Sequence, residues 1–378
     1  MRRLTSLPIE TFQGDFFVAL FEPLTAGALH LPNRIVMSPL TRGRATREHV
    51  PTPRMATYYA QRAGAGLIIS EASPISKQGA GWPYSPGFWS DEQVAAWQPV
   101  TQAVHEAGGR IVAQLWHMGR VVHPSLSGEQ PVSASAITAP GQAHTYEGKQ
   151  PYAEPRELRL DEIPGLIADY VHAAKNAIRA GFDGIQVHAA NGYLIDQFLR
   201  DGTNKRTDAY GGSIENRARL LIEVTQAIAD AIGPERTAVR VSPNGDTQGV
   251  IDSNPEPLFV HVARELDKIG IAFLEVRDVA PYSTFGSTDQ PIVSPAIRAN
   301  FSGVLILNGD YNVARAEEAL AEGRADAIAF GRPFIANPDL PARIAAGAPL
   351  AEANVATFYS QGDEGYIDYP PMDAAQAA

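Results

Sequence analysis

The sequence predicts one domain folded as a (β/α)8 (TIM) barrel, because short apolar runs and helical segments alternate along it. Eight apolar runs occur in the 378 residues, and a segment with helical periodicity follows each run. The runs are apolar throughout, as expected for parallel strands buried on both faces. Such strand–helix units within this length are typical of the barrel. The main alternative is an open doubly wound sheet, but that fold usually carries a G-x-G-x-x-G turn, and the chain has none.

The predicted elements begin after a loose extension over residues 1–15. The segment 16–31 holds Pro23 and Gly27 between apolar runs and predicts a small hairpin. Strands are predicted at residues 34–42, 67–72, 110–115, 184–187, 237–242, 272–276, 304–308 and 327–330. Helices are predicted at residues 55–63, 91–107, 161–180, 213–232, 256–269, 294–300, 313–322 and 339–345. Asp91 stands near the start of the second helix and Gly323 follows the seventh, as these residue types favour helix ends.

One segment departs from this alternation. Residues 120–157 are rich in Pro, Ser and Gly and lack helical periodicity, so they predict an excursion of loops and hairpins after the third strand. Residues 371–378 predict a loose tail. The chain from 1 to 378 is therefore expected to be a single barrel domain with these appendages.

Composition and charge exclude several classes of protein. A formal net charge of -11 argues against nucleic acid and anionic membrane as partners. The absence of cysteine excludes disulfides, iron–sulfur clusters and thiol catalysis. Neither a signal-peptide run nor a bilayer-spanning segment is recognised. No His-Glu-x-x-His motif or P-loop occurs, and no metal site is expected. We expect a cytoplasmic enzyme acting on small molecules, as a monomer or homodimer.

Three polar side chains follow the fourth predicted strand, in the stretch from Gly184 to Arg200. If the chain turns helically there, His188 and Asn191 share one face and point two neutral donors at one acceptor atom. Tyr193 lies close by, with a phenol protonated at neutral pH because its reference pKa is near ~10. A carbonyl oxygen held by such a pair beside an acid describes a site that polarises and protonates an enone. The alternative is a buried histidine, a turn asparagine and a core tyrosine.

Polar residues also stand where other predicted strands end, at the barrel mouth where active sites form. The strand ends carry Thr41, Ala72, Gln114, His188, Arg240, Asn308 and Arg332. Taken singly, Gln114 could be a satisfied amide, Arg240 a structural ion pair and Arg332 a helix-end contact. Together they would leave several buried polar groups in need of partners, so a bound polar ligand accounts for them best.

The last two strand ends indicate the kind of ligand. Asn-Gly-Asp at 308–310 and Gly-Arg-Pro at 331–333 match the usual barrel phosphate site, where glycines let backbone amides approach an anion. A phosphate there and a flat polar ring over the barrel centre fit flavin mononucleotide (FMN). Arg240 would lie near the N1–C2 edge of the ring and favour the reduced anion. Gln114 would bond the pyrimidine edge and Thr41 the C4 carbonyl.

Longer runs of sequence surround these positions. They are Asn-Arg-Ile-Val-Met-Ser-Pro-Leu-Thr-Arg at 33–42, Gln-Leu-Trp-His-Met-Gly-Arg at 114–120, His-Ala-Ala-Asn-Gly-Tyr-Leu at 188–194, Asn-Lys-Arg-Thr-Asp-Ala-Tyr-Gly-Gly-Ser-Ile-Glu-Asn-Arg at 204–217 and Phe-Gly-Arg-Pro-Phe at 330–334. In this order they resemble motifs of the Old Yellow Enzyme family of flavin-dependent ene reductases. The resemblance extends over residues 21–370.

The resemblance implies roles for individual residues. The residues that would contact FMN, bound tightly without a covalent bond, are Pro39, Leu40, Thr41, Ala72, Gln114, Arg240, Asn308, Gly309, Gly331 and Arg332. His188 and Asn191 would hold the activating oxygen of the substrate, and Tyr193 would be the proton donor. Trp82, Trp116 and Tyr359 would line the substrate side of the flavin.

The resemblance also implies an activity. The family reduces activated C=C bonds in α,β-unsaturated ketones, aldehydes, imides and nitroalkenes, by ping-pong hydride transfer from NAD(P)H through flavin N5. Thermophilic-type members resemble one another in placing Cys where Thr41 stands, so this chain looks classical, with a His/Asn substrate pair. The runs Thr-Arg-Gly-Arg-Ala-Thr-Arg at 41–47 and Gly-Trp-Pro-Tyr at 81–84 are similar to those of bacterial 2-cyclohexenone and N-ethylmaleimide reductases.

Two other functions compete with this interpretation. A barrel lyase or aldolase could use the same phosphate site for a sugar phosphate, but it needs a Schiff-base lysine or metal-binding carboxylates at strand ends. Glu71 and Glu275 are present, whereas no predicted strand ends in lysine. A flavin-storage or sensor protein without turnover is the other rival, and the complete His/Asn/Tyr set argues against it. The sequence leaves open the physiological substrate and the choice between NADH and NADPH.

Overall fold

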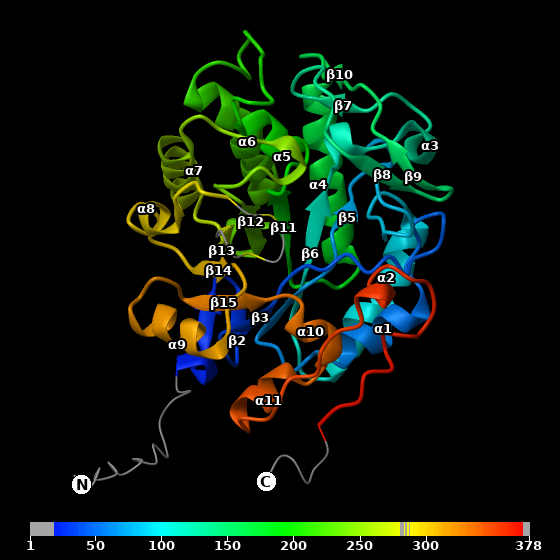
Figure 1. The fold of residues 1–378 in the computed structure, drawn as a ribbon, viewed down its shortest axis with the longest axis vertical. Coiled ribbons are helices and arrows are strands. Elements are labelled where there is room, and N and C mark those ends of the chain that lie inside the picture. Colours follow the sequence, from blue (N-terminus) through cyan, green and yellow to red (C-terminus); the bar gives the residue numbers. More distant parts are fainter. Residues whose placement is uncertain (1–18, 280–282, 284–285, 287, 373–378) are drawn as a thin grey trace, which may run out of the picture.

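The computed structural model describes residues 19–279, 283, 286 and 288–372. The extension predicted for residues 1–15 lies outside this part, and so do residues 373–378 of the predicted tail. Helices surround a central set of strands in Figure 1.

The central strands form a closed parallel barrel. They are β3 (Ile35–Met37), β4 (Leu67–Ile69), β6 (Ile111–Trp116), β11 (Gly184–Ala189), β12 (Thr237–Val241), β13 (Phe273–Arg277), β14 (Leu305–Asn308) and β15 (Ala327–Phe330). Each pairs in parallel with the next, and β15 pairs with β3 to close the barrel. The two-residue β5 (Ser73–Pro74) adds to the end of β6. This confirms the predicted (β/α)8 fold, and every predicted strand is present.

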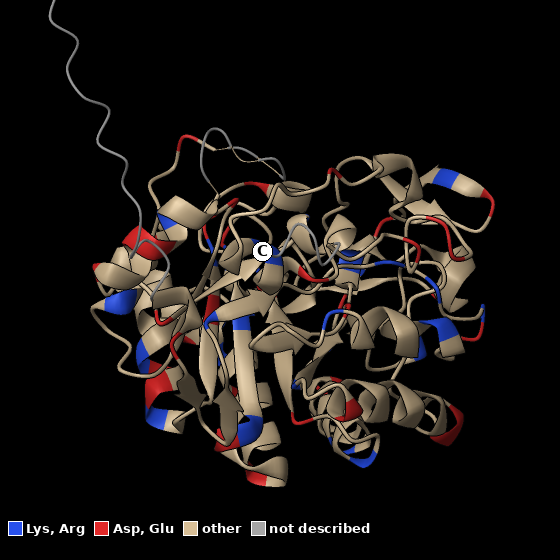
Figure 2. Cartoon of the chain, turned by 90° about the horizontal axis from the view of Figure 1, so that it is seen from below, with Lys and Arg blue, Asp and Glu red and all other residues tan. Residues whose placement is uncertain are grey.

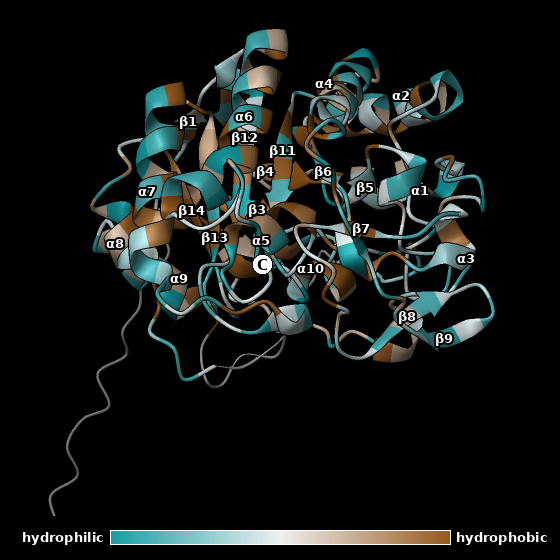
Figure 3. Cartoon of the chain, turned by 90° about the horizontal axis from the view of Figure 1, so that it is seen from above, coloured by the Kyte–Doolittle hydropathy of each residue, from teal (hydrophilic) through white to brown (hydrophobic). Residues whose placement is uncertain are grey.

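The predicted helices are present too. They are α1 (Pro53–Ala60), α2 (Asp91–Glu106), α4 (Ile163–Arg179), α6 (Ile214–Ile232), α7 (Pro255–Ile269), α8 (Ser294–Arg298), α9 (Val313–Ala321) and α11 (Leu340–Ala345). The short helices α5 (Leu194–Leu199) and α10 (Pro333–Ala336) follow β11 and β15 and were not predicted. Figure 3 shows hydrophobic residues gathered on the central strands and hydrophilic ones on the outer sides of the helices. The strands are therefore buried from both faces, as their unbroken apolar runs require.

The N-terminal hairpin covers the end of the barrel at which the strands begin. It consists of β1 (Leu24–Ala26) and β2 (Leu29–Leu31), paired antiparallel. Its side chains pack with Val36, Val112 and other residues of the barrel interior. Gly27 turns the hairpin at φ 58°, and a Cβ there would lie 2.3 Å from the backbone oxygen of Glu235. The predicted hairpin is therefore confirmed over residues 24–31, whereas residues 19–21 form a 3-10 helix.

The excursion after the third barrel strand is also confirmed. It contains the short helix α3 (Pro124–Ser127), the hairpin of β8 (Gln142–Thr145) and β9 (Gly148–Pro151), and the parallel pair of β7 (Val132–Ser133) with β10 (Arg156–Glu157). Residues Pro140, Gly141, Gln142, His144 and Tyr152 of this excursion line a cavity at the barrel mouth. The excursion therefore covers the end of the barrel where strand-end side chains meet.

The start of α2 offers a test of local stability. The Ser90 hydroxyl accepts a hydrogen bond from the Gln93 amide at 3.2 Å, and the Gln93 side chain accepts one from the Ser90 amide at 3.2 Å. Because Ser90→Ala removes this cap, we expect the free energy of unfolding to fall by about 1 kcal/mol. Urea unfolding followed by circular dichroism measures the change. Ser90→Asp restores an acceptor and serves as the control, and equal losses in both variants would contradict the capping role.

Candidate active site

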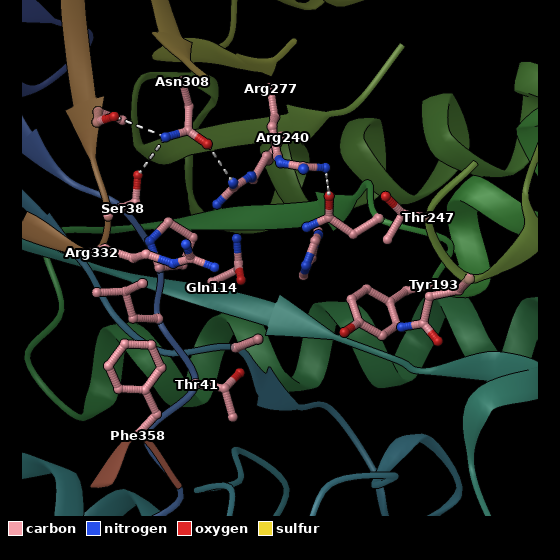
Figure 4. A pocket seen from close by; sticks show the side chains of 18 of the residues that line it. Ser38, Thr41, Gln114, Tyr193, Arg240, Thr247, Arg277, Asn308, Arg332 and Phe358 are labelled. Carbon is pink, nitrogen blue, oxygen red and sulfur yellow. Dashed lines mark hydrogen bonds between the residues drawn. The ribbon is translucent and has the colours of Figure 1, made fainter. Parts of the chain in front are cut away.

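A cavity of about 650 Å³ lies at the carboxyl ends of the barrel strands, and every residue predicted to belong to the site lines it. These residues are Pro39, Leu40, Thr41, Ala72, Trp82, Gln114, Trp116, His188, Asn191, Tyr193, Arg240, Asn308, Gly309, Gly331, Arg332 and Tyr359. Figure 4 shows several of them pointing into the same space from different strands. Side chains up to 320 positions apart in the sequence are therefore brought to one site by the barrel.

Hydrogen bonds and ion pairs among buried polar side chains connect several of the residues that line the cavity. Gln114 donates to Gln186 at 2.7 Å, and Gln186 donates to Glu275 at 2.7 Å. The other Glu275 oxygen lies 3.5 Å from Arg240, which also donates to Asn308 at 3.0 Å. Asn308 in turn donates to the Ser38 hydroxyl, as Figure 4 shows. Arg240 is thus held by a carboxylate and an amide with its charge beside the cavity.

The position of Gln114 differs from the prediction. It does not end its strand but lies in the middle of β6, which continues to Trp116. The sequence suggested that the strand ends at Gln114 because a polar residue after an apolar run usually marks the end of a buried strand. Here Gln114 is buried and satisfied by Gln186 across the neighbouring strand.

His188 lies within strand β11, with 4% of its surface exposed. Its ring packs edge-on against Tyr193, with centroids 5.0 Å apart, and lies 6.3 Å from the Trp116 ring. Burial, together with the charges of Arg240 and Arg277, holds the pKa of His188 well below its usual value. The imidazole is therefore neutral at pH 7 and carries one N–H donor.

Asn191 reaches the cavity from a left-handed turn. Its φ is 57° and that of Gly192 is 80°, so the helical turn expected at this point is wrong. The strand instead runs on to Ala189, and the turn follows it. The Asn191 amide nitrogen of the backbone donates to the Ser242 hydroxyl at 2.8 Å, and its side-chain oxygen accepts from Arg277 at 3.0 Å. Asparagine is among the residues that tolerate this conformation best.

Tyr193 precedes helix α5 and is partly buried at the cavity wall. Its ring packs edge-on against Trp116 with centroids 4.8 Å apart. Burial raises the pKa of Tyr193 above its usual range, and the neighbouring Tyr152 and Tyr359 add to the effect. The phenol therefore stays protonated at neutral pH. The turn before it is fixed by Asp196, which accepts from the Gly192 amide at 2.9 Å.

The ends of β14 and β15 supply the part of the cavity predicted to hold a phosphate. Arg332 is exposed and lies next to Gly331 at the start of α10. A Cβ placed on Gly331 would meet only ordinary contacts, with Leu40 at 3.6 Å and Ser38 at 3.9 Å. The described protein atoms thus leave room at Gly331 that a side chain would fill, as expected where a ligand approaches the backbone.

Aromatic side chains form the outer rim of the cavity. The Trp82 ring lies 5.0 Å from Tyr359 and 4.5 Å from His144, measured between ring centroids. Tyr359 is 52% exposed, so it stands at the entrance rather than in the interior. A flat ligand entering here would pass between aromatic faces.

The structure adds residues that the sequence did not single out. They are His144 and Tyr152 from the excursion, Thr247 and Gln248 after β12, Arg277 at the end of β13, and Phe358 near the C-terminus. The sequence could have indicated Arg277, because it directly follows the predicted strand 272–276. Arg240 likewise follows the first residues of the predicted strand 237–242. The others stand in segments whose sequence has no periodic pattern, so only the folded chain reveals them.

The cavity has the donors that FMN requires. In the described part of the chain, Trp116 Nε1, His188 Nδ1 and Arg240 Nε are buried without a hydrogen-bond partner. Such atoms cost free energy unless a ligand or water satisfies them. A cationic and glycine-lined end faces one side, and a set of polar strand-end side chains faces the other. These features fit a phosphate joined to a flat polar ring.

Other classes of site are not found among the described residues. No group of three or more His, Cys, Asp or Glu side chains could hold a metal ion there. No described helix combines the length and apolar character needed to cross a membrane. Acidic and basic segments alternate around the molecule in Figure 2, and neither sign forms a continuous face in that view.

Comparisons with known proteins show the family to which the chain belongs. The model of the NADH:flavin oxidoreductase / NADH oxidase family matches residues 19–351. The solved Old Yellow Enzyme homologue from Zymomonas mobilis is 60% identical, with a TM-score of 0.93 over 93% of this chain and 99% of that one. Morphinone reductase, solved in complex with tetrahydroNAD, is 48% identical, with a TM-score of 0.89 over 95% and 99% of the chains. The "Probable flavin mononucleotide-dependent alkene reductase" of Leishmania infantum is 42% identical over 93% of this chain and 97% of its own.

Proposed function

Because this chain belongs to the FMN-dependent NADH:flavin oxidoreductase family that includes the Old Yellow Enzymes, we propose that it is an ene reductase. It uses NAD(P)H to reduce C=C bonds activated by a neighbouring carbonyl, imide or nitro group. The observation that carries this proposal is the meeting of His188, Asn191 and Tyr193 at one wall of the cavity that also holds Arg240 and Arg332. Two hydrogen-bond donors for the activating oxygen and one proton donor for the α-carbon thus line the same cavity.

FMN would be held along the whole cavity. Gly309, Gly331 and Arg332 would bind its phosphate, because an arginine fork and backbone amides favour an anion. Arg240 would lie near the N1–C2 edge of the ring, Gln114 would bond its pyrimidine edge, and Thr41 would bond its C4 carbonyl. Bound FMN supplies a hydride acceptor and donor, so NAD(P)H and the alkene can use one site in turn.

His188 and Asn191 bind the oxygen of the activating group. Both are neutral, so they donate hydrogen bonds without transferring a proton to the oxygen. Negative charge grows on that oxygen as hydride reaches the β-carbon, and donors fixed in a buried site stabilise the charge more than water does. His188 is 4% exposed and Asn191 is anchored through its backbone, so little reorganisation is needed.

Tyr193 supplies the proton for the α-carbon. Its raised pKa keeps the phenol protonated, and its position beside His188 supports a role as proton donor to the carbon next to the bound oxygen. The printed names of two relatives support this substrate class. One is an alkene reductase and the other a morphinone reductase. We expect activity with 2-cyclohexenone and N-ethylmaleimide.

Anaerobic spectrophotometry of the purified protein tests the function. The protein should be yellow, with the two visible absorbance bands of oxidised flavin. NADH or NADPH should bleach it, and added 2-cyclohexenone should restore the colour without oxygen. A colourless protein with aldolase activity would support the lyase alternative. A yellow protein that bleaches but never recovers with any activated alkene would refute the ene reductase.

Loss of Arg332 tests the phosphate end. In Arg332→Ala we expect the dissociation constant of FMN to rise about 10- to 100-fold, because a charge-assisted hydrogen bond contributes about 1.5–3 kcal/mol. The half-reactions of the FMN-loaded variant should change little. Fluorescence titration of apoprotein with FMN measures the affinity. Arg324→Ala, at an exposed arginine outside this cavity, is the control, and unchanged FMN affinity in Arg332→Ala would contradict the phosphate assignment.

A further inference from the structure

Arg277 is buried beside the candidate substrate site and contacts one of its proposed donors. It ends strand β13, opposite Asn308 of β14, and only 6% of its surface is exposed. Its guanidinium donates to the side-chain oxygen of Asn191 at 3.0 Å. The dashed line from Arg277 in Figure 4 marks this hydrogen bond. The contact joins two elements that are 86 positions apart in the chain.

The contact fixes which end of the Asn191 amide faces the cavity. An asparagine side chain can rotate to present its oxygen or its NH₂ group. A guanidinium has five N–H donors and no acceptor, so only the amide oxygen can bond to it. With the oxygen held by Arg277, the NH₂ group of Asn191 is the end left for a ligand. Without Arg277, the amide could turn and present an acceptor to the ligand oxygen, which would repel it.

Charge is the second consequence. Burial and the neighbouring Arg240 lower the pKa of Arg277 to about 10, so it is still protonated at pH 7. The charged and titratable groups that face it are Arg240 from β12, Asp310 after β14, and His188 and Tyr193 from the β11 segment. A charged donor on the amide oxygen polarises the amide. The NH₂ group of Asn191 then donates stronger hydrogen bonds to a ligand.

We propose that Arg277 is a positioning residue that holds Asn191 as a one-way donor and makes the site selective for ligands whose oxygen carries negative charge. This inference rests on the proposed function, in which Asn191 binds the activating oxygen. It adds a third member to the pair seen in the sequence. The ligand class is a planar molecule with an ionised or ionising oxygen, such as a phenolate or the enolate-like state of the reaction.

Two variants separate the hydrogen bond that Arg277 donates to Asn191 from the positive charge of Arg277. Arg277→Gln can still donate a hydrogen bond to Asn191 but has no charge. Arg277→Met keeps the bulk of the chain and removes both. Binding of a neutral ketone needs only the oriented amide, whereas binding of a phenolate also uses the charge. We therefore expect Arg277→Gln to bind 2-cyclohexenone like wild type and to bind phenolates more weakly.

The experiment is titration of each FMN-loaded protein with p-nitrophenol across pH, because the absorbance of the phenolate reports ionisation of the bound ligand. Wild type should lower the pKa of the bound phenol relative to the free one. Both Arg277 variants should raise it toward the free value and weaken phenolate binding about 10- to 100-fold, as expected for one hydrogen bond to a charged group. FMN content and circular dichroism check that each variant is folded, and Arg277→Gln alone suffices if Arg277→Met loses FMN.

A double-mutant cycle with Asn191→Ala assigns the effect. If Arg277 acts through Asn191, adding Arg277→Gln to Asn191→Ala should change phenolate binding less than about twofold. Additive losses would overturn the inference, and so would an Arg277→Gln protein that binds phenolate like wild type. If Asn191→Ala itself binds the phenolate normally, the proposed oxygen site is wrong and Arg277 has no such role. A loss in Asn191→Ala without one in Arg277→Gln refutes the Arg277 role alone.

Discussion

The variant His188→Ala will lose about 100- to 1,000-fold in the rate at which an enone reoxidises the reduced enzyme, because one donor to a developing oxyanion contributes ~2.7–4 kcal/mol. His188 is buried and neutral, and its Nδ1 has no partner among the described residues. Its removal also leaves space beside Trp116, so enone affinity should fall as well. Reduction by NAD(P)H should slow far less, because no comparable charge develops on the nicotinamide oxygen.

Stopped-flow measurement of the two half-reactions separates these effects. His144→Ala is the matched control, since His144 lines the same cavity at its rim, 4.5 Å from the Trp82 ring. That variant should change the apparent enone affinity without a comparable loss of rate. Equal slowing of both half-reactions in His188→Ala, with FMN still bound, would mean that His188 positions the flavin rather than the enone.

The barrel could be predicted because the burial of its strands requires apolar runs that are visible in the sequence. Strands buried on both faces must be apolar throughout, and runs such as Leu67–Ile69 and Leu305–Asn308 keep that pattern up to the strand end. The barrel then forces strand-end side chains together, so His188 and Arg240 could be placed at one mouth without any knowledge of contacts. For these residues local pattern and global fold agree.

The remaining features depend on contacts between distant segments. The left-handed turn at Asn191 could not be told from a helical turn, because asparagine is compatible with both and the choice is fixed by Ser242, which follows β12, and Arg277, which ends β13. Gln114 seemed to end a strand because its partner, Gln186, lies 72 positions away. His144 was not predicted because no pattern in the sequence of the β8–β9 hairpin indicates which of its side chains face the cavity.

The variant Tyr193→Phe will separate two classes of substrate. It keeps the ring that packs 4.8 Å from Trp116 and removes only the hydroxyl. A positioned general acid contributes roughly 100- to 10,000-fold, so turnover of 2-cyclohexenone should fall by at least about 100-fold. Reduction by NAD(P)H should stay nearly normal. Tyr152→Phe, which removes another hydroxyl from the same cavity, is the matched control and should not show this selective loss.

Nitroalkenes make this test specific for the proton. Hydride addition to an enone gives an enolate-like species that needs protonation at carbon before the product is stable. Addition to a nitroalkene gives a nitronate, which is stable enough to leave the site and take its proton from water. Tyr193→Phe should therefore still reoxidise with a nitroalkene and release the nitronate, detectable by its ultraviolet absorbance. A stable, FMN-loaded variant that loses both substrate classes equally would show that Tyr193 is a packing residue. Selective loss in Tyr152→Phe instead would make Tyr152 the donor, since its hydroxyl shares the cavity wall near Gln248.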